Sequence, residues 1–166
     1  EREGKIGHRW YLWVFKSEQV VCFVLDPSRS ASVPMAALDG AAGVLSVDRY
    51  ASYRKFARQT PGMHLAICWA HQRRDFLRVA NDHPGLWAWA MGWVQQIGQL
   101  YRLHAQRREH AGDMVSEGFV ESDTRLRALL AAMSTQCDTE LSDAQLAEAA
   151  RKVLHTLRSY WPGLVR

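Results

Sequence analysis

The spacing of apolar residues changes near residue 80, and this change limits the fold more than any other feature of the chain. Before that point, apolar residues form short runs of strand length that are rich in aromatic and β-branched types. After it, they recur at helical spacing, as Trp89, Trp93 and Ile97 do. The sequence therefore predicts a mixed α/β segment over residues 1–80 and an all-helical segment over residues 81–166.

Apolar runs and breaker residues place the individual elements. The predicted strands cover residues 10–15, 20–25, 43–48 and 63–69, and the first two flank a polar turn typical of an antiparallel hairpin. The predicted helices cover residues 32–38, 50–59, 87–110, 122–133 and 142–161, and a further helix is predicted to start with residues 71–76. We expect Ser32 to cap the first helix, Ser142 and Gln145 to form a capping box, and Pro162 to end the last helix.

Composition limits the possible partners and cellular environment of the chain but does not identify a function. A net charge of +4 is compatible with a polyanionic partner such as DNA, although charge alone is weak evidence. The three cysteines are odd in number and far apart, which favours a reducing, cytoplasmic environment over a disulfide framework. No apolar run approaches the length of a membrane span, so no membrane partner is expected.

Asp48 lies where a short apolar strand meets a helix, in the sequence VDRYASY. Ligand groups collect at strand ends in open α/β sheets, and a carboxylate there can bind a hard divalent cation. The alternative is an aspartate that caps the following helix, and spacing alone favours the cap.

The sequence CWAHQRRDF holds a second group of polar residues at the start of a predicted helix. Cys68 and His71 have a spacing seen in zinc sites, but zinc needs three or four protein ligands and no second pair is near. Arg73 and Arg74 could contact DNA phosphates. Otherwise, Cys68 is a core residue and His71 a polar turn residue.

The sequence DPSRS follows the predicted hairpin. Its aspartate, Asp26, is expected to bind local backbone amides and so close a turn. Arg29 could reach a phosphate, although a solvated arginine is the more ordinary outcome. The neighbouring residues Trp87, Trp89 and Trp93 are expected to pack between helices rather than to stack on bases.

Taken in order, YLWVF, DPSRS, GVLSVDRYASY and CWAHQRRDF resemble the insertion-sequence-66 (TnpC-type) family of DDE transposases. The resemblance is clear over residues 8–80 and weaker through the helical part to YWPGLVR. It implies a ribonuclease-H-like mixed sheet in which residues 43–48 form the fourth strand. The first strand would be missing upstream, so residues 1–80 would be a partial catalytic core and residues 81–166 a helical insertion or linker.

The resemblance also implies a chemistry and a site. It places Asp48 at the second of three catalytic acids that hold two Mg²⁺ or Mn²⁺ ions for DNA cleavage and strand transfer. With DNA as the implied substrate, we predict that His71, Arg73 and Arg74 at the start of a helix contact it. The first acid would lie upstream and the third downstream, so the chain would be an internal fragment of a bacterial, nucleoid-associated enzyme that acts on transposon ends.

Two consequences follow from that implied fragment. With one acid of three, we expect no tight metal binding and no activity from the chain alone. An exposed sheet edge should be compensated by a homodimer, a domain swap or a rearranged sheet. Two other functions stay open: a non-catalytic DNA-binding or protein-interaction module derived from a transposase, and a plain α/β domain whose Asp48 only caps a helix.

Overall fold

An antiparallel hairpin opens the part of the chain described by the computed structural model, which covers residues 9–166. Strand β1 (Tyr11–Lys16) pairs with β2 (Val21–Asp26) so that Tyr11 lies opposite Asp26 and Lys16 opposite Val21. Alternate β1 residues point to opposite faces, and Trp13 and Phe15 are buried. They form a core with Val33 of the next helix, so the predicted hairpin is confirmed.

A second small sheet follows in the same compact unit, Glu1–Ala66. Helix α1 (Ser32–Ala37) leads to β3 (Gly43–Val47), α2 (Ala51–Gln59) and β4 (Met63–Ile67). The amide of Gly43 donates to the carbonyl of Gly62 at 2.9 Å, so both strands begin side by side. This is the arrangement expected of parallel strands joined by a crossover helix.

The two sheets are separate, each with two strands, in the described part of the chain. The mixed α/β class is therefore confirmed, whereas a single ribonuclease-H-like sheet stays a prediction. Within α1, the expected cap is wrong: Ala31 occupies the N-cap position, and Ser32 is already the first helical residue.

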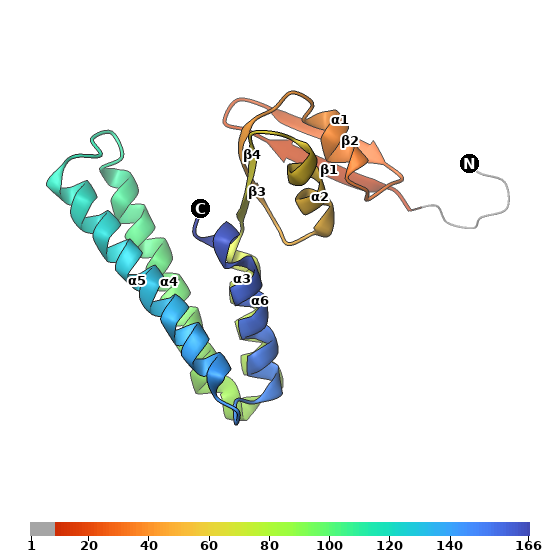
Figure 1. The fold of residues 1–166 in the computed structure, drawn as a ribbon. Helices are drawn as coiled ribbons and strands as arrows, with labels where there is room; N and C mark the ends of the chain where they lie inside the picture. The colour runs from red at the N-terminus through yellow and green to blue at the C-terminus, as the bar shows by residue number, and fades with distance from the viewer. Residues whose placement is uncertain (1–8) are drawn as a thin grey trace. The chain divides into compact units, whose positions relative to one another are not determined.

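The second compact unit, Ile67–Arg166, is helical. It contains α3 (Trp69–Asp82), a short 3₁₀ turn (Pro84–Leu86), α4 (Trp87–Glu109), α5 (Glu117–Ser142) and α6 (Glu148–Leu164). Helices α4 and α5 run side by side as a long hairpin, and α3 packs against α4 and α6 (Figure 1). A division of the whole protein into domains at residue 80 stays a prediction.

The ends of α5 and α6 differ from the prediction. Helix α5 runs to Ser142, whose hydroxyl donates to the carbonyl of Thr139 inside that helix instead of capping α6. Asp143 accepts the amide of Gln145 at 2.9 Å in the connecting turn, so the predicted capping box is wrong. Helix α6 also continues through Pro162 to Leu164, beyond its expected end.

Aromatic stacking and one carboxylate join α3, α4 and α5. The rings of Phe76 and Trp93 are fully buried and stack with centroids 5.3 Å apart. The indole N–H groups of Trp89 and Trp93 both donate to Oε2 of Glu140, at 2.8 and 3.2 Å. These two tryptophans pack between helices as predicted, whereas Trp87 is exposed, contrary to the prediction.

The described helices also bear on the membrane expectation. None of the helices in residues 9–166 combines the length and the apolar character needed to cross a bilayer.

Candidate functional site

Asp48 is exposed and lies directly after β3, as the sequence predicted. Its Oδ1 accepts a hydrogen bond from the amide of Tyr50 at 2.8 Å. Tyr50, not Asp48, occupies the N-cap position of α2, and no side chain caps that helix. Asp48 therefore orders the turn between β3 and α2 without capping α2 itself.

One oxygen of the Asp48 carboxylate is left for a ligand. Within residues 9–166, the amide of Tyr50 is the hydrogen-bond partner recorded for Asp48, and no ion pair engages it. Carboxylates that bind metals are commonly held by a hydrogen bond to one oxygen while the other faces the ion. The geometry at Asp48 is compatible with that role.

A metal centre nevertheless needs more ligands than this part of the chain brings together. No group of three or more histidine, cysteine, aspartate or glutamate side chains gathers within the described residues. Cys68 occupies the N-cap position of α3, and its carbonyl accepts the amide of His71 at 3.2 Å. The described residues by themselves therefore do not fit a two-metal centre or a zinc site.

The loop after β2 is attached to the same region as Asp48. Asp26 Oδ1 accepts the amide of Ser28 at 2.6 Å, which confirms the predicted turn. The carbonyl of Arg29 accepts hydrogen bonds from the Tyr50 hydroxyl at 2.9 Å and the Ser52 hydroxyl at 2.6 Å. The DPSRS and VDRYASY segments, about twenty residues apart in the sequence, are thus hydrogen-bonded to each other.

Aromatic rings surround this meeting point. The Tyr50 and Tyr53 rings lie edge to face at 6.3 Å, and both rings lie beside Trp13. Burial raises the pKa of the Tyr53 hydroxyl; the nearby Asp48 carboxylate raises it further, whereas the Arg29 guanidinium lowers it. Asp48 and Arg29 therefore act on the same tyrosine.

The sequence analysis assigned no role to Tyr50. An available signal was the repetition of tyrosine at a spacing of three residues in VDRYASY, where a helix is predicted to begin.

Arg73 and Arg74 are exposed on α3, while Gln72 and Phe76 of the same helix are buried. The ion pairs recorded for the described residues include neither arginine. Both side chains therefore lie at the surface without an ion pair in the described part of the chain, and their contact with DNA stays a prediction.

His71, the third predicted DNA contact, has a different environment. Its Nδ1 is buried and lacks a hydrogen-bond partner among the residues that the structure describes. A buried ring nitrogen without a hydrogen-bond partner raises the free energy of the folded state. Asp48 belongs to the first unit, and His71, Arg73 and Arg74 belong to the second.

Tyr101 of α4 lies near the start of α3. Burial raises the pKa of the Tyr101 hydroxyl, the nearby Cys68 raises it further, and Arg73 lowers it. Charged groups at the beginning of α3 thus act on a tyrosine in the middle of α4, within the second unit.

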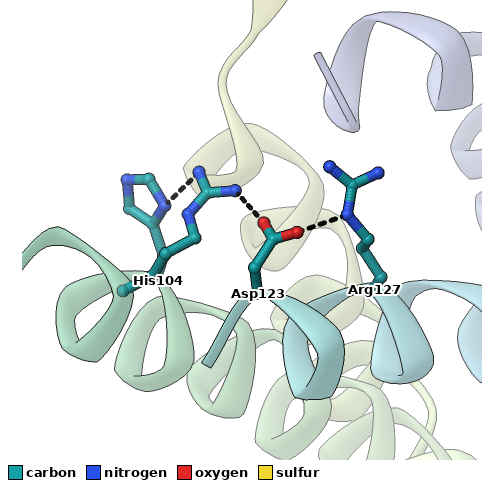
Figure 2. Close-up of polar contacts among 4 residues, drawn as sticks. His104, Asp123 and Arg127 are labelled. Carbon is teal, nitrogen blue, oxygen red and sulfur yellow. Dashed lines mark hydrogen bonds and ion pairs between the residues drawn. The ribbon is translucent and has the colours of Figure 1, made fainter. Parts of the chain in front are cut away.

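A separate ionic network holds the far end of the α4–α5 hairpin together (Figure 2). Arg107 Nη1 contacts Asp123 Oδ1 at 2.7 Å, Arg127 Nε donates to Asp123 Oδ2 at 2.5 Å, and His104 Nδ1 lies 3.2 Å from Arg107. Hydrogen bonds from Arg127 and Arg107 lower the pKa of the Asp123 carboxyl. Its two oxygens are thus occupied, which indicates a structural role.

Comparison with known proteins adds a family. The family model described as "Transposase IS66 family" matches residues 1–166. An uncharacterized protein, y4jD of Sinorhizobium fredii (strain NBRC 101917 / NGR234), is 27% identical over 160 residues. The match covers 92% of this chain and 30% of that relative, so the chain spans about a third of the relative's length. No solved structure matches the chain.

Proposed function

The chain belongs to the IS66 family of transposases, and from this premise we propose that it is part of an enzyme that cleaves and joins DNA. In this proposal, Asp48 supplies one of the carboxylates that bind Mg²⁺ or Mn²⁺. The observation that carries it is the position of Asp48 at a strand end, with one oxygen held by the amide of Tyr50.

The remaining ligands would come from outside the described residues, because these contain no cluster of three metal-binding side chains. The relative from Sinorhizobium fredii has most of its length outside the match, which leaves room for further acidic residues. We expect the 166-residue chain alone to bind a divalent cation weakly and to show no strand transfer. Two-metal chemistry needs several anionic ligands, and one carboxylate does not supply them.

We also propose a ribonuclease-H-like arrangement in the intact protein, in which both described sheets are parts of one mixed sheet. Strands β1 and β2 form one pair and β3 and β4 another, and no third strand joins either pair in residues 9–166. A further strand placed between the pairs would complete one mixed sheet.

Helix α3 is the proposed DNA-contacting element of the chain. Arg73 and Arg74 are exposed on it, and arginine binds phosphate through two parallel hydrogen bonds. We include His71 because its buried Nδ1 has no described partner, and a rearranged side chain could satisfy it on DNA binding. DNA binding in the bacterial nucleoid follows from this proposal.

The test is metal-dependent DNA cleavage and strand transfer by the intact protein that contains this chain. Asp48→Asn keeps the size of the side chain and removes its charge, and we expect activity to fall by more than roughly 100-fold, beyond what outer partners of metal ligands contribute. Asp39→Asn is the matched control, because Asp39 is exposed and lies before β3. Equal activity of the Asp48→Asn variant and the control would refute the catalytic role.

The second candidate is a non-catalytic DNA-binding module, which the exposed arginines of α3 favour. It predicts salt-dependent DNA binding that weakens with Arg73→Ala and Arg74→Ala but is unaffected by Asp48→Asn. If the intact protein binds DNA in this way and lacks cleavage activity, the second candidate replaces the first.

A further inference from the structure

The arginine of the DPSRS loop is held in a way that an ordinary solvated arginine is not. The Arg29 guanidinium lies 4.4 Å from the centre of the Tyr50 ring and 5.3 Å from the centre of the Tyr11 ring. Cation–π contact at these distances is favourable even at an exposed site. The side chain therefore has a preferred position although Arg29 is exposed.

The backbone beneath this side chain is fixed independently. The Arg29 carbonyl accepts the hydroxyls of Tyr50 and Ser52, and the neighbouring Ser28 carbonyl accepts the indole N–H of Trp13 at 3.2 Å. These bonds attach the loop to β1 and α2 through its main chain. Replacing the Arg29 side chain should therefore leave the loop in place.

The tyrosine contacts position the Arg29 guanidinium without an anionic partner in residues 9–166. The group carries five N–H donors in a planar fork. Across the described residues, no carboxylate forms an ion pair with Arg29. A fixed guanidinium with unused donors is suited to a planar, bidentate oxyanion partner.

The neighbouring groups indicate where such a partner would lie. Tyr50 contacts the Arg29 guanidinium with its ring and holds Asp48 with its amide, so a single residue connects the two charged groups. We propose that Arg29, whose guanidinium lies over the rings of Tyr11 and Tyr50, is a phosphate-binding residue that holds a phosphodiester of the DNA backbone beside Asp48. This inference rests on the proposed function and assigns a substrate contact within the same site.

The first measurement is the salt dependence of binding to a short DNA duplex by the 166-residue chain. Each phosphate contact contributes about 0.9 to the slope of log affinity against log salt concentration. We expect Arg29→Ala to lower the slope by about one and Arg29→Lys to weaken binding less. Arg58→Ala is the matched control, because Arg58 is exposed on the last turn of α2, and it should leave the slope unchanged.

Folding of each variant is checked by circular dichroism and thermal melting, and the retained main-chain bonds predict little change for Arg29→Ala. An equal slope for Arg29→Ala and wild type, or an equal decrease for Arg29→Ala and Arg58→Ala, would overturn the inference. In either case, wild-type DNA binding that depends on Arg73 and Arg74 would leave the proposed function standing.

A second measurement separates failure of the inference from failure of the proposed function. Inorganic phosphate is titrated into the ¹⁵N-labelled chain, and the Nε–Hε signal of Arg29 is followed. A saturating shift for Arg29 that exceeds the shift for Arg58 supports phosphate binding by Arg29. If the chain then binds no DNA, phosphate binding by Arg29 stands, whereas the proposed function and the assignment of DNA as the source of the phosphate are overturned. Absence of both DNA binding and a selective Arg29 shift would overturn the inference as well.

Discussion

Asp123 shows how a single carboxylate can be committed to structure and therefore unavailable for catalysis. Both of its oxygens are bound by arginines, one from α4 and one from its own helix (Figure 2). Asp48, in contrast, has one oxygen bound by a backbone amide. The difference in partners, rather than the residue type, distinguishes the structural carboxylate from the candidate metal ligand.

The Asp123 network predicts a specific pH dependence of stability. Hydrogen bonds from Arg127 and Arg107 lower the pKa of Asp123 in the folded chain, so its contribution is complete above the unfolded pKa of about 3.9 and is lost as pH falls through the folded value. We expect Asp123→Asn to lower the melting temperature by a few degrees at pH 7. The difference from wild type should shrink as pH falls from about 4 towards 2.

Glu121→Gln is the control for this prediction. Glu121 pairs with Arg125 on the surface of the same helix, at 3.7 Å, and such exposed pairs contribute little. Thermal melts of the three proteins across this pH range provide the measurement. A melting temperature of Asp123→Asn equal to that of wild type at pH 7 would show that the network does not stabilise the hairpin.

At the scale of elements, α6 fits closely against the start of the second unit. A Cβ at Gly163 would lie 2.6 Å from Cγ1 of Ile67, which is buried, so a larger residue would force a rearrangement. We expect Gly163→Ala to lower the free energy of unfolding by about 1–3 kcal/mol, the usual effect of overpacking. Chemical denaturation of the chain measures this change.

Gly92, inside α4, provides the matched comparison. A Cβ there would meet no atom within 4 Å. Alanine is favoured over glycine within a helix by roughly 0.5–1 kcal/mol, so Gly92→Ala should stabilise the chain. Opposite signs for the two variants are predicted, and destabilisation by both to the same extent would contradict the packing of α6.

The sequence predicted elements better than it predicted their ends. Apolar runs identified the hairpin because its strands carry apolar residues on both faces, and glycines marked the starts of β3 and β4. The capping box at Ser142 failed because a serine with a suitable neighbour three residues on also fits the last turn of a long helix. That helix is stabilised by packing, which local sequence does not record.

The sequence identified some residues of the candidate site and missed others, because local sequence does not record contacts between distant residues. Asp48, Arg73 and Arg74 carry recognisable chemistry at element ends, and each is exposed in the structure. The contacts of Arg29 with Tyr11 and Tyr50 join residues that lie far apart in the sequence. Spacing along one chain does not reveal such contacts, whereas the folded hairpin and α2 bring them together.

At the scale of the whole molecule, one face of the hairpin is apolar and exposed. Leu12 lies opposite Leu25 and Val14 opposite Phe23, and these four side chains are between 52% and 65% exposed. Apolar surface gathered in this way is typical of an interaction site. The two strands that form this face, β1 and β2, pair only with each other in the described part of the chain.

We predict that the 166-residue chain self-associates through this face, a different surface from the sheet edge at which the sequence predicts a homodimer. Phe23→Lys should weaken the dimer by at least about tenfold, or roughly 1.4 kcal/mol, because it places a charge in the contact. Val115→Lys is the control, since Val115 is exposed in the second unit. Sedimentation that gives a monomer at all concentrations up to about 100 µM would contradict the prediction.

We propose that the Asp48 carboxylate binds a divalent cation, and Mn²⁺ titration of the ¹⁵N-labelled chain tests this role most directly. Paramagnetic broadening should begin at residues 48–50, exceed the broadening around Asp39, and disappear in Asp48→Asn. The affinity should be low, because one carboxylate is present. Broadening that is no greater around Asp48 than around Asp39, or that persists in Asp48→Asn, would contradict the account.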